Sequence, residues 1–360
     1  MKSSSTLKVG ALALVFLTIQ GCGPMLYRMT GGRIGDPGEV VVDEFNFSAA
    51  SANPAEVAGD YFDETHADSM DNEIRLVIPT VRFLFNTRQG AAASAQGSTN
   101  RAGYSASVKV TMNLANVDDK VFQQIADENW AKLKSGLEGL GFKVIDPSEY
   151  ADNENWKKLL EKDTSKGEAK PIDFYGGEFV MVTPKGMPAY TYPGEEGALS
   201  VFGAFNLSSR SDILEQNLAK DLDKAIVVTP TFVIDFAKCY KSGGTFSDTA
   251  AAQCKPVMTL RHNTTTKFAN MTKMDSFLGA QSAAGQINLT RNIETSENFG
   301  SLQKVDSDNT EIYIPYYSYT SSSSSVYAVV ADAERYREVA GKVIGAGIDL
   351  TLATIKEEMD

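Results

Sequence analysis

The chain has 360 residues and a formal net charge of −12 at pH 7. Nucleic-acid binding requires clustered Lys and Arg side chains that neutralise phosphates, and the sequence has no basic run, so we expect no nucleic-acid partner. Only two histidines and three cysteines are present, which leaves few candidates for acid–base or metal chemistry.

The N-terminus has the pattern of a bacterial export signal. Lys2 and Lys8 precede an apolar run at residues 9–19, which ends just before Cys22. A membrane-spanning helix needs roughly 20 apolar residues, so this run is too short to be one. We therefore predict that residues 1–21 are a signal peptide. The alternative is an ordinary secretory signal followed by an incidental cysteine.

The four residues Ile-Gln-Gly-Cys that end at Cys22 resemble the lipobox of bacterial lipoproteins. The resemblance implies a lipid on the Cys22 thiol and an acylated amino group, and two or more acyl chains give stable membrane anchoring. Gly23 follows the cysteine where an aspartate would favour the inner membrane. The resemblance thus implies anchoring to the outer membrane, with the protein facing the periplasm.

The next segments indicate a tether and then a long hairpin. Residues 22–70 are rich in Gly, Pro, Asn, Asp and Ala, which predicts a tether and a loosely packed lead-in. Residues 74–85 are β-branched and aromatic, and residues 104–114 alternate, so both segments are expected to be strands. Residues 88–103, which are small and polar, would form a mobile tip. A second interpretation is that this hairpin inserts into a membrane as part of an oligomeric pore.

Helix and strand patterns then alternate. Asp118 precedes a predicted amphipathic helix that ends at Gly141, and residues 142–145 follow as a predicted strand. A looser unit has a short helix around Trp156 and a strand at residues 179–182. The third unit is a helix from Ser211 to Leu222 and a strand at residues 225–236, where Pro230 suggests an edge position or a bulge. Further strands are expected at residues 257–268, 286–290 and 311–319.

The end of the chain has a serine-rich break at residues 321–325, a short strand at residues 326–330 and a long helix that opens at Asp332. Gly345 and Gly347 are expected kink or close-packing points of that helix. The fold class is therefore α/β or α+β, a mixed sheet with flanking helices. We expect a periplasmic domain at 71–320, followed by the strand and helix of residues 321–360.

Cys239 and Cys254 form an even pair in an exported chain, which predicts a disulfide at the end of a hairpin. A closed loop of about 15 residues would stabilise the fold by roughly 3 kcal/mol. The alternative, a metal or redox site, lacks both a Cys-x-x-Cys spacing and a nearby histidine.

No residue pattern points to catalysis, a cofactor or a metal. The histidines are His66, in the lead-in, and His262, inside an alternating segment, and no nucleophile elbow, zinc-binding helix or phosphate-binding loop is present. The acidic residues of one helix, namely Asp118, Asp119, Asp127 and Glu128, are explained by capping and solvation, although a glycosidase-like pair is an alternative.

Tyrosines gather at Tyr190 and Tyr192 and again within residues 313–319. Such clusters can bind sugars or partner chains, but a strand with one buried face has the same pattern. We favour packing in the core or at a sheet edge.

Three segments, residues 74–81, 133–145 and 217–228, resemble the periplasmic α/β domain of curli-secretion-type lipoproteins and of the amino-terminal domain of the Tol translocation family. The resemblance covers roughly residues 70–270. It implies a lipid-anchored periplasmic part of an export, flagellar or envelope assembly, often a ring. The connection at 183–194 and the C-terminal third depart from the family pattern.

Two functional hypotheses follow. The first is a non-enzymatic structural, assembly or secretion accessory protein that is anchored to the membrane by its lipid and contacts other envelope proteins or itself. The alternative is a protein that binds envelope polysaccharide, or an enzyme that acts on glycan through carboxylates.

Overall fold

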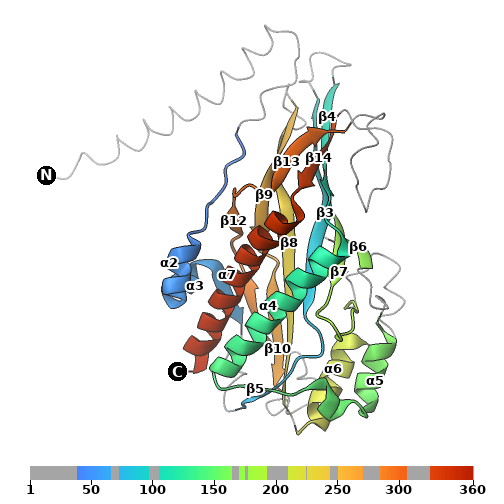
Figure 1. Ribbon diagram of the computed structural model, residues 1–360, viewed down its shortest axis with the longest axis vertical. Helices are drawn as coiled ribbons and strands as arrows, with labels where there is room; N and C mark the ends of the chain where they lie inside the picture. Colours follow the sequence, from blue (N-terminus) through green and yellow to red (C-terminus); the bar gives the residue numbers. More distant parts are fainter. Residues whose placement is uncertain are drawn as a thin grey trace, which may run out of the picture.

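The computed structural model shows one mixed sheet of 14 strands with helices on both faces, which confirms the α/β class (Figure 1). It describes residues 39–65, 73–96, 105–163, 170–174, 177–192, 210–223, 225–243, 250–270, 284–305 and 325–359. The signal peptide, Cys22, His66 and the tyrosines of residues 313–319 lie outside these ranges, so the predictions made for them stay predictions.

The sheet contains parallel and antiparallel pairs. Its main path runs β1-β11-β10-β8-β3-β4-β14-β13, and the other strands pair with members of this path. The strands are β1 (Phe62–Thr65), β2 (Arg75–Val77), β3 (Arg82–Gln96), β4 (Ser105–Ala115), β5 (Lys143–Val144), β6 (Lys170–Phe174), β7 (Gly177–Val182), β8 (Ile226–Ser242), β9 (Ala251–Leu260), β10 (Thr265–Asn270), β11 (Ala284–Leu289), β12 (Ile293–Thr295), β13 (Gly300–Lys304) and β14 (Ser325–Ala331).

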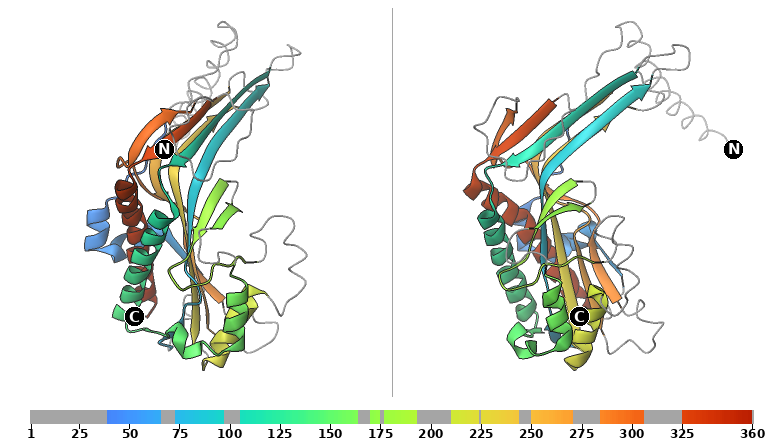
Figure 2. Two further views of the ribbon diagram at one scale, coloured as in Figure 1. Left: turned by 45° about the vertical axis from the view of Figure 1, so that its right-hand side comes forward. Right: turned by 90° about the vertical axis from the view of Figure 1, so that its right-hand side faces the viewer.

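Helices α4 and α7 lie against one face of the sheet, and the smaller α5 and α6 lie at the opposite face near one end (Figure 2). The main core is between the sheet and the first pair, and a second cluster of buried residues lies under the other pair. The helices are α2 (Phe47–Ala52), α3 (Pro54–Tyr61), α4 (Asp119–Gly139), α5 (Glu154–Glu161), α6 (Ser211–Asp221) and α7 (Ala333–Met359), with a short 3-10 helix at Pro147–Tyr150.

The sheet forks where its two longest strands separate. β3 and β8 pair in parallel, with Arg82 opposite Thr231 and Phe85 opposite Ile234. Beyond this point β3 pairs with β4, and β8 pairs with β9. Because β3 and β8 run in the same direction, their hairpins point to the same end of the molecule. β14 is parallel to β4, so the β13–β14 hairpin points there as well (Figure 1).

We call the outer parts of these hairpins the arms. They comprise residues 88–96 with 105–111, residues 238–243 with 250–256, and residues 300–305 with 325–331. Each arm is a two-stranded antiparallel ribbon, and the first and third are joined because β4 pairs with β14. The arms extend past the helices at one end of the molecule (Figure 2).

Three predictions about strands were wrong. The expected strand at residues 257–268 is the end of β9 and the start of β10, with a turn at residues 262–263 between them, so His262 is not inside a strand. The expected strand at residues 74–85 is two strands, β2 and β3, and β3 continues through the expected tip as far as Gln96 because this part pairs with β4. Pro230 is neither at an edge nor at a bulge, since β8 pairs with strands on both sides. On one side, Pro230 pairs with Thr266 of β10. On the other side, Val227 pairs with β2 and Thr231 pairs with β3, and Pro230 lies between these two pairings.

The lead-in is more ordered than its composition suggests. Its described part forms α2, α3 and β1, and Phe45, Tyr61 and Phe62 are buried in the main core. The rings of Phe45 and Tyr61 meet edge to face, with centroids 5.0 Å apart. The segment expected to be loosely packed therefore covers part of α7 and the sheet.

Local signals placed most helices correctly. Asp118 caps α4 by accepting hydrogen bonds from the backbone of Lys120 and Val121, and Gly141 ends this unit with φ +95°. α7 is continuous, and a Cβ on Gly347 would lie 2.3 Å from Cδ2 of Leu260, so this glycine is a close-packing point. Cys239 and Cys254 are directly opposite each other in β8 and β9 and form the expected disulfide.

Candidate functional site

A polar cavity of about 300 Å³ lies where β3 and β8 separate. Its walls come from four strands and their ends, so residues far apart in the sequence meet there. The lining residues are Asn86, Gln89 and Gly90 of β3; Asp235, Ala237, Lys238 and Cys239 of β8; Thr259, Arg261 and His262 of β9 and its end; and Asn292 and Glu294 at β12.

Two β-bulges shape this cavity. Against β7, Asn86 pairs with Phe179 and Arg88 pairs with Glu178, so Thr87 is an extra residue in β3. An extra residue shifts the alternation of side chains, which lets Asn86 and Gln89, three residues apart, line the same cavity. The pairing of β8 with β9 shifts between Asp235 and Ala237, at the same level of the fork.

The inner end of the cavity is rich in hydrogen-bond acceptors that have no protein donor. Asn86, Asp235 and Thr259 are all at most 5% exposed. Within the described ranges, no hydrogen-bond partner reaches Asn86 Oδ1, Gln89 Oε1, Asp235 Oδ1 or Thr259 Oγ1. Each of these four atoms has less than 1 Å² of accessible surface, so they lie within the protein at the base of the cavity wall. Buried polar atoms without a partner are uncommon in native proteins, and these four make the base of the fork unusually polar for a buried region.

The buried carboxyl group of Asp235 dominates the electrostatics of the inner end. Burial raises the pKa of Asp235 to about 6, although Arg261 and a hydrogen bond from Asn86 favour the charged form. Arg261 Nε lies 3.5 Å from Asp235 Oδ2, whereas Asp235 Oδ1 is buried and has no hydrogen-bond partner among the described residues.

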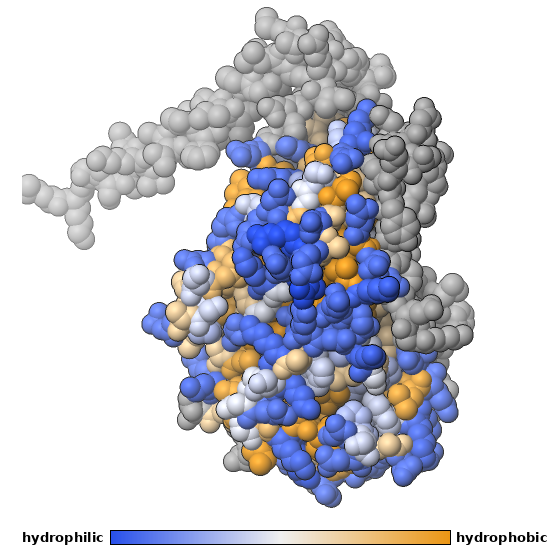
Figure 3. Space-filling model, viewed as in Figure 1, coloured by the Kyte–Doolittle hydropathy of each residue, from blue (hydrophilic) through white to orange (hydrophobic). Residues whose placement is uncertain are grey.

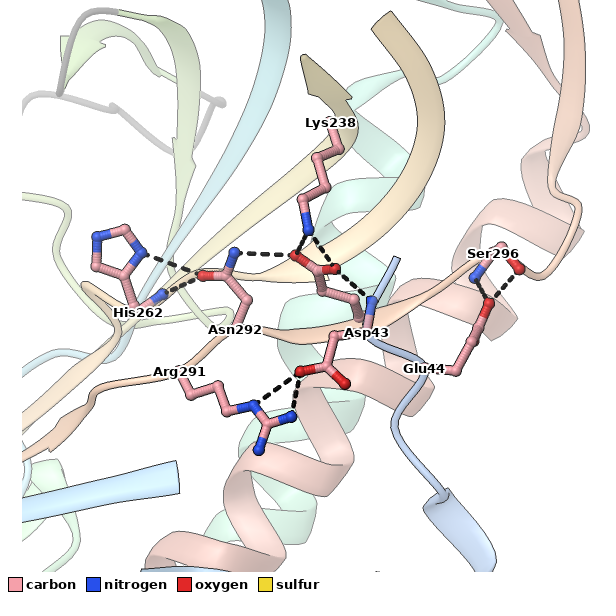
Figure 4. A network of polar contacts seen from close by, with 8 residues as sticks. Asp43, Glu44, Lys238, His262, Arg291, Asn292 and Ser296 are labelled. Atoms are coloured by element: carbon pink, nitrogen blue, oxygen red, sulfur yellow. Dashed lines mark hydrogen bonds and ion pairs between the residues drawn. The ribbon is translucent and has the colours of Figure 1, made fainter. Parts of the chain in front are cut away.

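Glu294 is the second buried carboxylate of the cavity, and both of its oxygens accept hydrogen bonds (Figure 4). Lys238 Nζ donates to both of its oxygens at 2.9 and 2.7 Å, and Asn292 Nδ2 donates at 3.0 Å. The backbone N–H of Asp43 donates to Glu294 at 3.1 Å. The side chains of Asp43 and Glu44 continue the network by pairing with Arg291 and Ser296, so this wall of the cavity holds the start of the described chain in place.

The residues singled out from the sequence have separate positions. Cys239 is part of the cavity wall, and His262 is at its exposed side with Nδ1 3.1 Å from Asn292 Oδ1. The acidic residues of α4 are not gathered into a pair. Asp118 caps the helix, Asp127 accepts hydrogen bonds from Gln123 and from the backbone of Lys185, and Glu128 pairs with Arg337.

Tyr190 and Tyr192 belong to the protein interior, as packing predicted. Their hydroxyls donate to Glu215 Oε1 at 2.6 and 2.7 Å, and the guanidinium of Arg82 stacks over the Tyr192 ring at 4.3 Å. Burial raises the pKa of Glu215 to about 7, against the lowering effect of the two tyrosine hydrogen bonds. Tyr192 is therefore a partner of a buried acid and not part of a surface for sugar rings.

The sequence did not identify Asn86, Asp235 or Glu215 as notable residues. A signal was available for Asp235, which is a single acidic residue between Ile234 and Phe236 in an otherwise apolar strand. A carboxylate in such a position must be desolvated or paired when the strand is buried.

No protein-family model, curated protein or solved structure matches this chain. The resemblance to secretion lipoproteins therefore stays a prediction. In the part of the chain that the structure describes, no three or more His, Cys, Asp or Glu residues are grouped to hold a metal ion. Within the same ranges, no helix is long and apolar enough to span a membrane.

Proposed function

We propose that this protein is a lipid-anchored, non-enzymatic component of the bacterial envelope that assembles with copies of itself through its hairpin arms. The observation that carries the proposal is that all three arms point to one end of the molecule. Copies that are anchored through Cys22 to one membrane would be confined to a thin layer beside it, which raises the effective concentration of their arms for one another.

Most of the buried side chains of the arms are small. They are Ala91, Val110, Thr111, Ala250, Ala251, Ala328, Val329 and Ala331, of which Val329 and Ala331 belong to the main core, and the partly buried Cys254 and Tyr327 pack against that core. The first and third arms form one four-stranded layer through β4 and β14, but the second arm is a two-stranded hairpin, which is marginally stable in water and gains stability when another surface covers it. Tyr240 and Leu302, on two of the arms, are 46% and 47% exposed, which gives a neighbouring copy apolar side chains to bury.

The helical face of the molecule is less suited to association. The surface formed by α4 and α7 is mostly hydrophilic, with hydrophobic residues scattered over it (Figure 3). Ion pairs such as Lys132–Asp349 and Arg337–Glu128 also lie on these helices. Such a surface favours contact with water over burial against another protein.

The first experiment is the mass of the lipidated protein in mild detergent, measured by light scattering after size-exclusion chromatography. We expect a defined oligomer, and a Tyr240→Ser/Leu302→Ser variant should shift it towards the monomer with little change in thermal stability. Met359→Ser is the matched control, because Met359 is 41% exposed at the end of α7, far from the arms. A wild-type monomer would disprove self-assembly.

Two further readouts test the other parts of the proposal. Cys22→Ser should prevent lipid attachment and release the protein from membranes, and retention in the membrane fraction would disprove the anchor. The purified protein should not turn over envelope glycans or peptides, and measurable turnover would disprove the non-enzymatic role.

A further inference from the structure

The charges on the described parts of the arms are all of one sign. Their charged residues are Arg88, Lys109, Lys238, Lys241, Lys255 and Lys304, and these segments contain no Asp or Glu. The whole chain has 46 acidic and 34 basic residues, so the rest of the molecule carries an excess of negative charge. The molecule is therefore polarised, with a basic end at the arms and an acidic body.

Three lysines of the first two arms are exposed, namely Lys109 on β4, Lys241 on β8 and Lys255 on β9, and we call them the basic surface. The basic residues at the roots of these arms, Arg88 and Lys238, are already paired with carboxylates. The third arm is left out, because the sequence between β13 and β14 contains three acidic residues. The corresponding sequences of the first two arms contain one basic and one acidic residue, so they do not change the balance.

Charges of one sign oppose the proposed assembly unless something neutralises them. Copies that associate through their arms bring their basic surfaces close together. Exposed like charges repel one another within a Debye length, which is about 10 Å at 0.1 M salt. An anionic surface at the arm end would remove this repulsion.

The start of the described chain lies at the same end. It runs from the height of the arms past β12 to α2 (Figure 1). Sixteen residues separate Cys22 from Glu39, and they span at most roughly 60 Å however they fold. α7 begins near the arms and is about 40 Å long, so the opposite end of the molecule is much further from this point. A membrane that carries the Cys22 lipid is therefore reached most directly from the arm end.

We propose that the basic surface binds the anionic phospholipid headgroups of the membrane that carries the anchor, with the arms towards the lipid and the acidic body away from it. Lysine suits this contact, because its ammonium group is a compact charge on a flexible stem and each lysine near an anionic membrane adds to the attraction. The inference rests on the proposed anchor, and it gives the proposed assembly an orientation.

The test is co-sedimentation of the full-length Cys22→Ser protein with vesicles of phosphatidylcholine alone, or of equimolar phosphatidylcholine and phosphatidylglycerol. This variant has no lipid, so the pellet reports contact through the protein surface. We expect binding to the anionic vesicles alone at about 0.1 M salt, and release at about 1 M salt, where the Debye length falls to about 3 Å. A lipid-anchored protein resists this wash, so the membrane-fraction test of the anchor is read after it.

Two triple variants of this protein lose the same charge at different places. Lys109→Gln/Lys241→Gln/Lys255→Gln removes the basic surface and should weaken binding to the anionic vesicles by about tenfold or more. The matched control removes three exposed lysines of α5 and α7 and should leave binding unchanged; it is Lys157→Gln/Lys158→Gln/Lys356→Gln.

The absence of binding to anionic vesicles, equal binding to both kinds of vesicle, or equal effects of the two triple variants would overturn the proposal. If removal of the basic surface abolished self-association of the Cys22→Ser protein without vesicles, the lysines would bind another copy and the proposal would also fail. A wild type that is monomeric or carries no lipid would disprove the proposed function, whereas vesicle binding by the Cys22→Ser protein would be unaffected.

Discussion

Lys238 of β8 reaches Glu294 of β12 and donates to both of its carboxylate oxygens, at 2.9 and 2.7 Å. Glu294 is 1% exposed, whereas the Lys238 side chain is 36% exposed. The pair therefore joins the rim of the cavity to its buried wall. Because the Asp43 backbone also binds Glu294, the same carboxylate positions the segment that leads into α2.

Removal of the lysine should destabilise the fold. Lys238→Met leaves a buried carboxylate with neutral donors only, and breaking a buried pair costs about 3–5 kcal/mol, reduced here because Lys238 is partly solvated. We expect a loss of about 1–3 kcal/mol in the free energy of unfolding, measured by urea denaturation. The double variant Lys238→Met/Glu294→Gln should recover part of this loss, and a larger loss in the double variant would contradict the pairing.

The disulfide should stabilise the second arm. A loop of about 15 residues predicts roughly 3 kcal/mol from the entropy of the unfolded chain. Cys239→Ser/Cys254→Ser should lower the free energy of unfolding by about this amount, and reduction of the wild type should have the same effect. The fold should persist, because β8 also pairs with β3 and β10. Equal stability with and without reductant would contradict the prediction.

Glu215 should make stability depend on pH. Its pKa is about 7 in the folded protein, because of burial, and 4.5 is its ordinary value. Between these values the unfolded chain loses the proton and the folded protein keeps it, so the free energy of unfolding falls as pH rises. The free energy of unfolding should therefore be lower above about pH 7 than below about pH 4.5, by on the order of 3 kcal/mol.

Glu215→Gln isolates this contribution. Glutamine keeps a hydrogen-bond acceptor for Tyr190 and Tyr192 and does not ionise. The groups whose charges act on Glu215, among them Arg82 and Asp212, remain in the variant. The difference in unfolding free energy between variant and wild type should increase from pH 4.5 to pH 7, and a difference that is constant across this range would rule out the buried titration.

The elements that the sequence predicted best depend on local patterns. Apolar residues at every third or fourth position define α4, and the Asp118 cap and the glycine at 141 mark its limits. The Cys239–Cys254 disulfide was predicted because these are the two cysteines that remain beside Cys22, and cysteine pairs in exported chains usually form disulfides. These features depend on neighbours in sequence and on few tertiary contacts.

The cavity could not be predicted in the same way. Its four acceptors belong to β3, β8 and β9, and the bulge at Thr87 brings Asn86 and Gln89 to one side. A bulge depends on the register with the partner strand, which the sequence of one strand does not contain. The length of β3 was underestimated for a related reason, since its run of alanines and polar residues is a strand only because β4 pairs with it.

The contact of α7 with the sheet provides a test that uses two glycines of one helix. A Cβ on Gly347 would lie 2.3 Å from Cδ2 of the fully buried Leu260, whereas a Cβ on Gly341 would have no neighbour within 4 Å. Gly341→Ala should raise the free energy of unfolding by about 0.5–1 kcal/mol, because alanine favours the helix. Gly347→Ala has the same helical gain but must displace Leu260, so it should be less stable than Gly341→Ala by about 1–3 kcal/mol.

Leu260→Val should relieve part of this clash, because it removes one carbon from the crowded side chain. In a double-mutant cycle measured by urea unfolding, Gly347→Ala and Leu260→Val should couple by at least about 0.5 kcal/mol, in the direction that favours the double variant. Gly341→Ala with Leu260→Val should be additive, since these positions are not in contact. Additivity for both pairs would mean that Gly347 does not set the distance between α7 and β9.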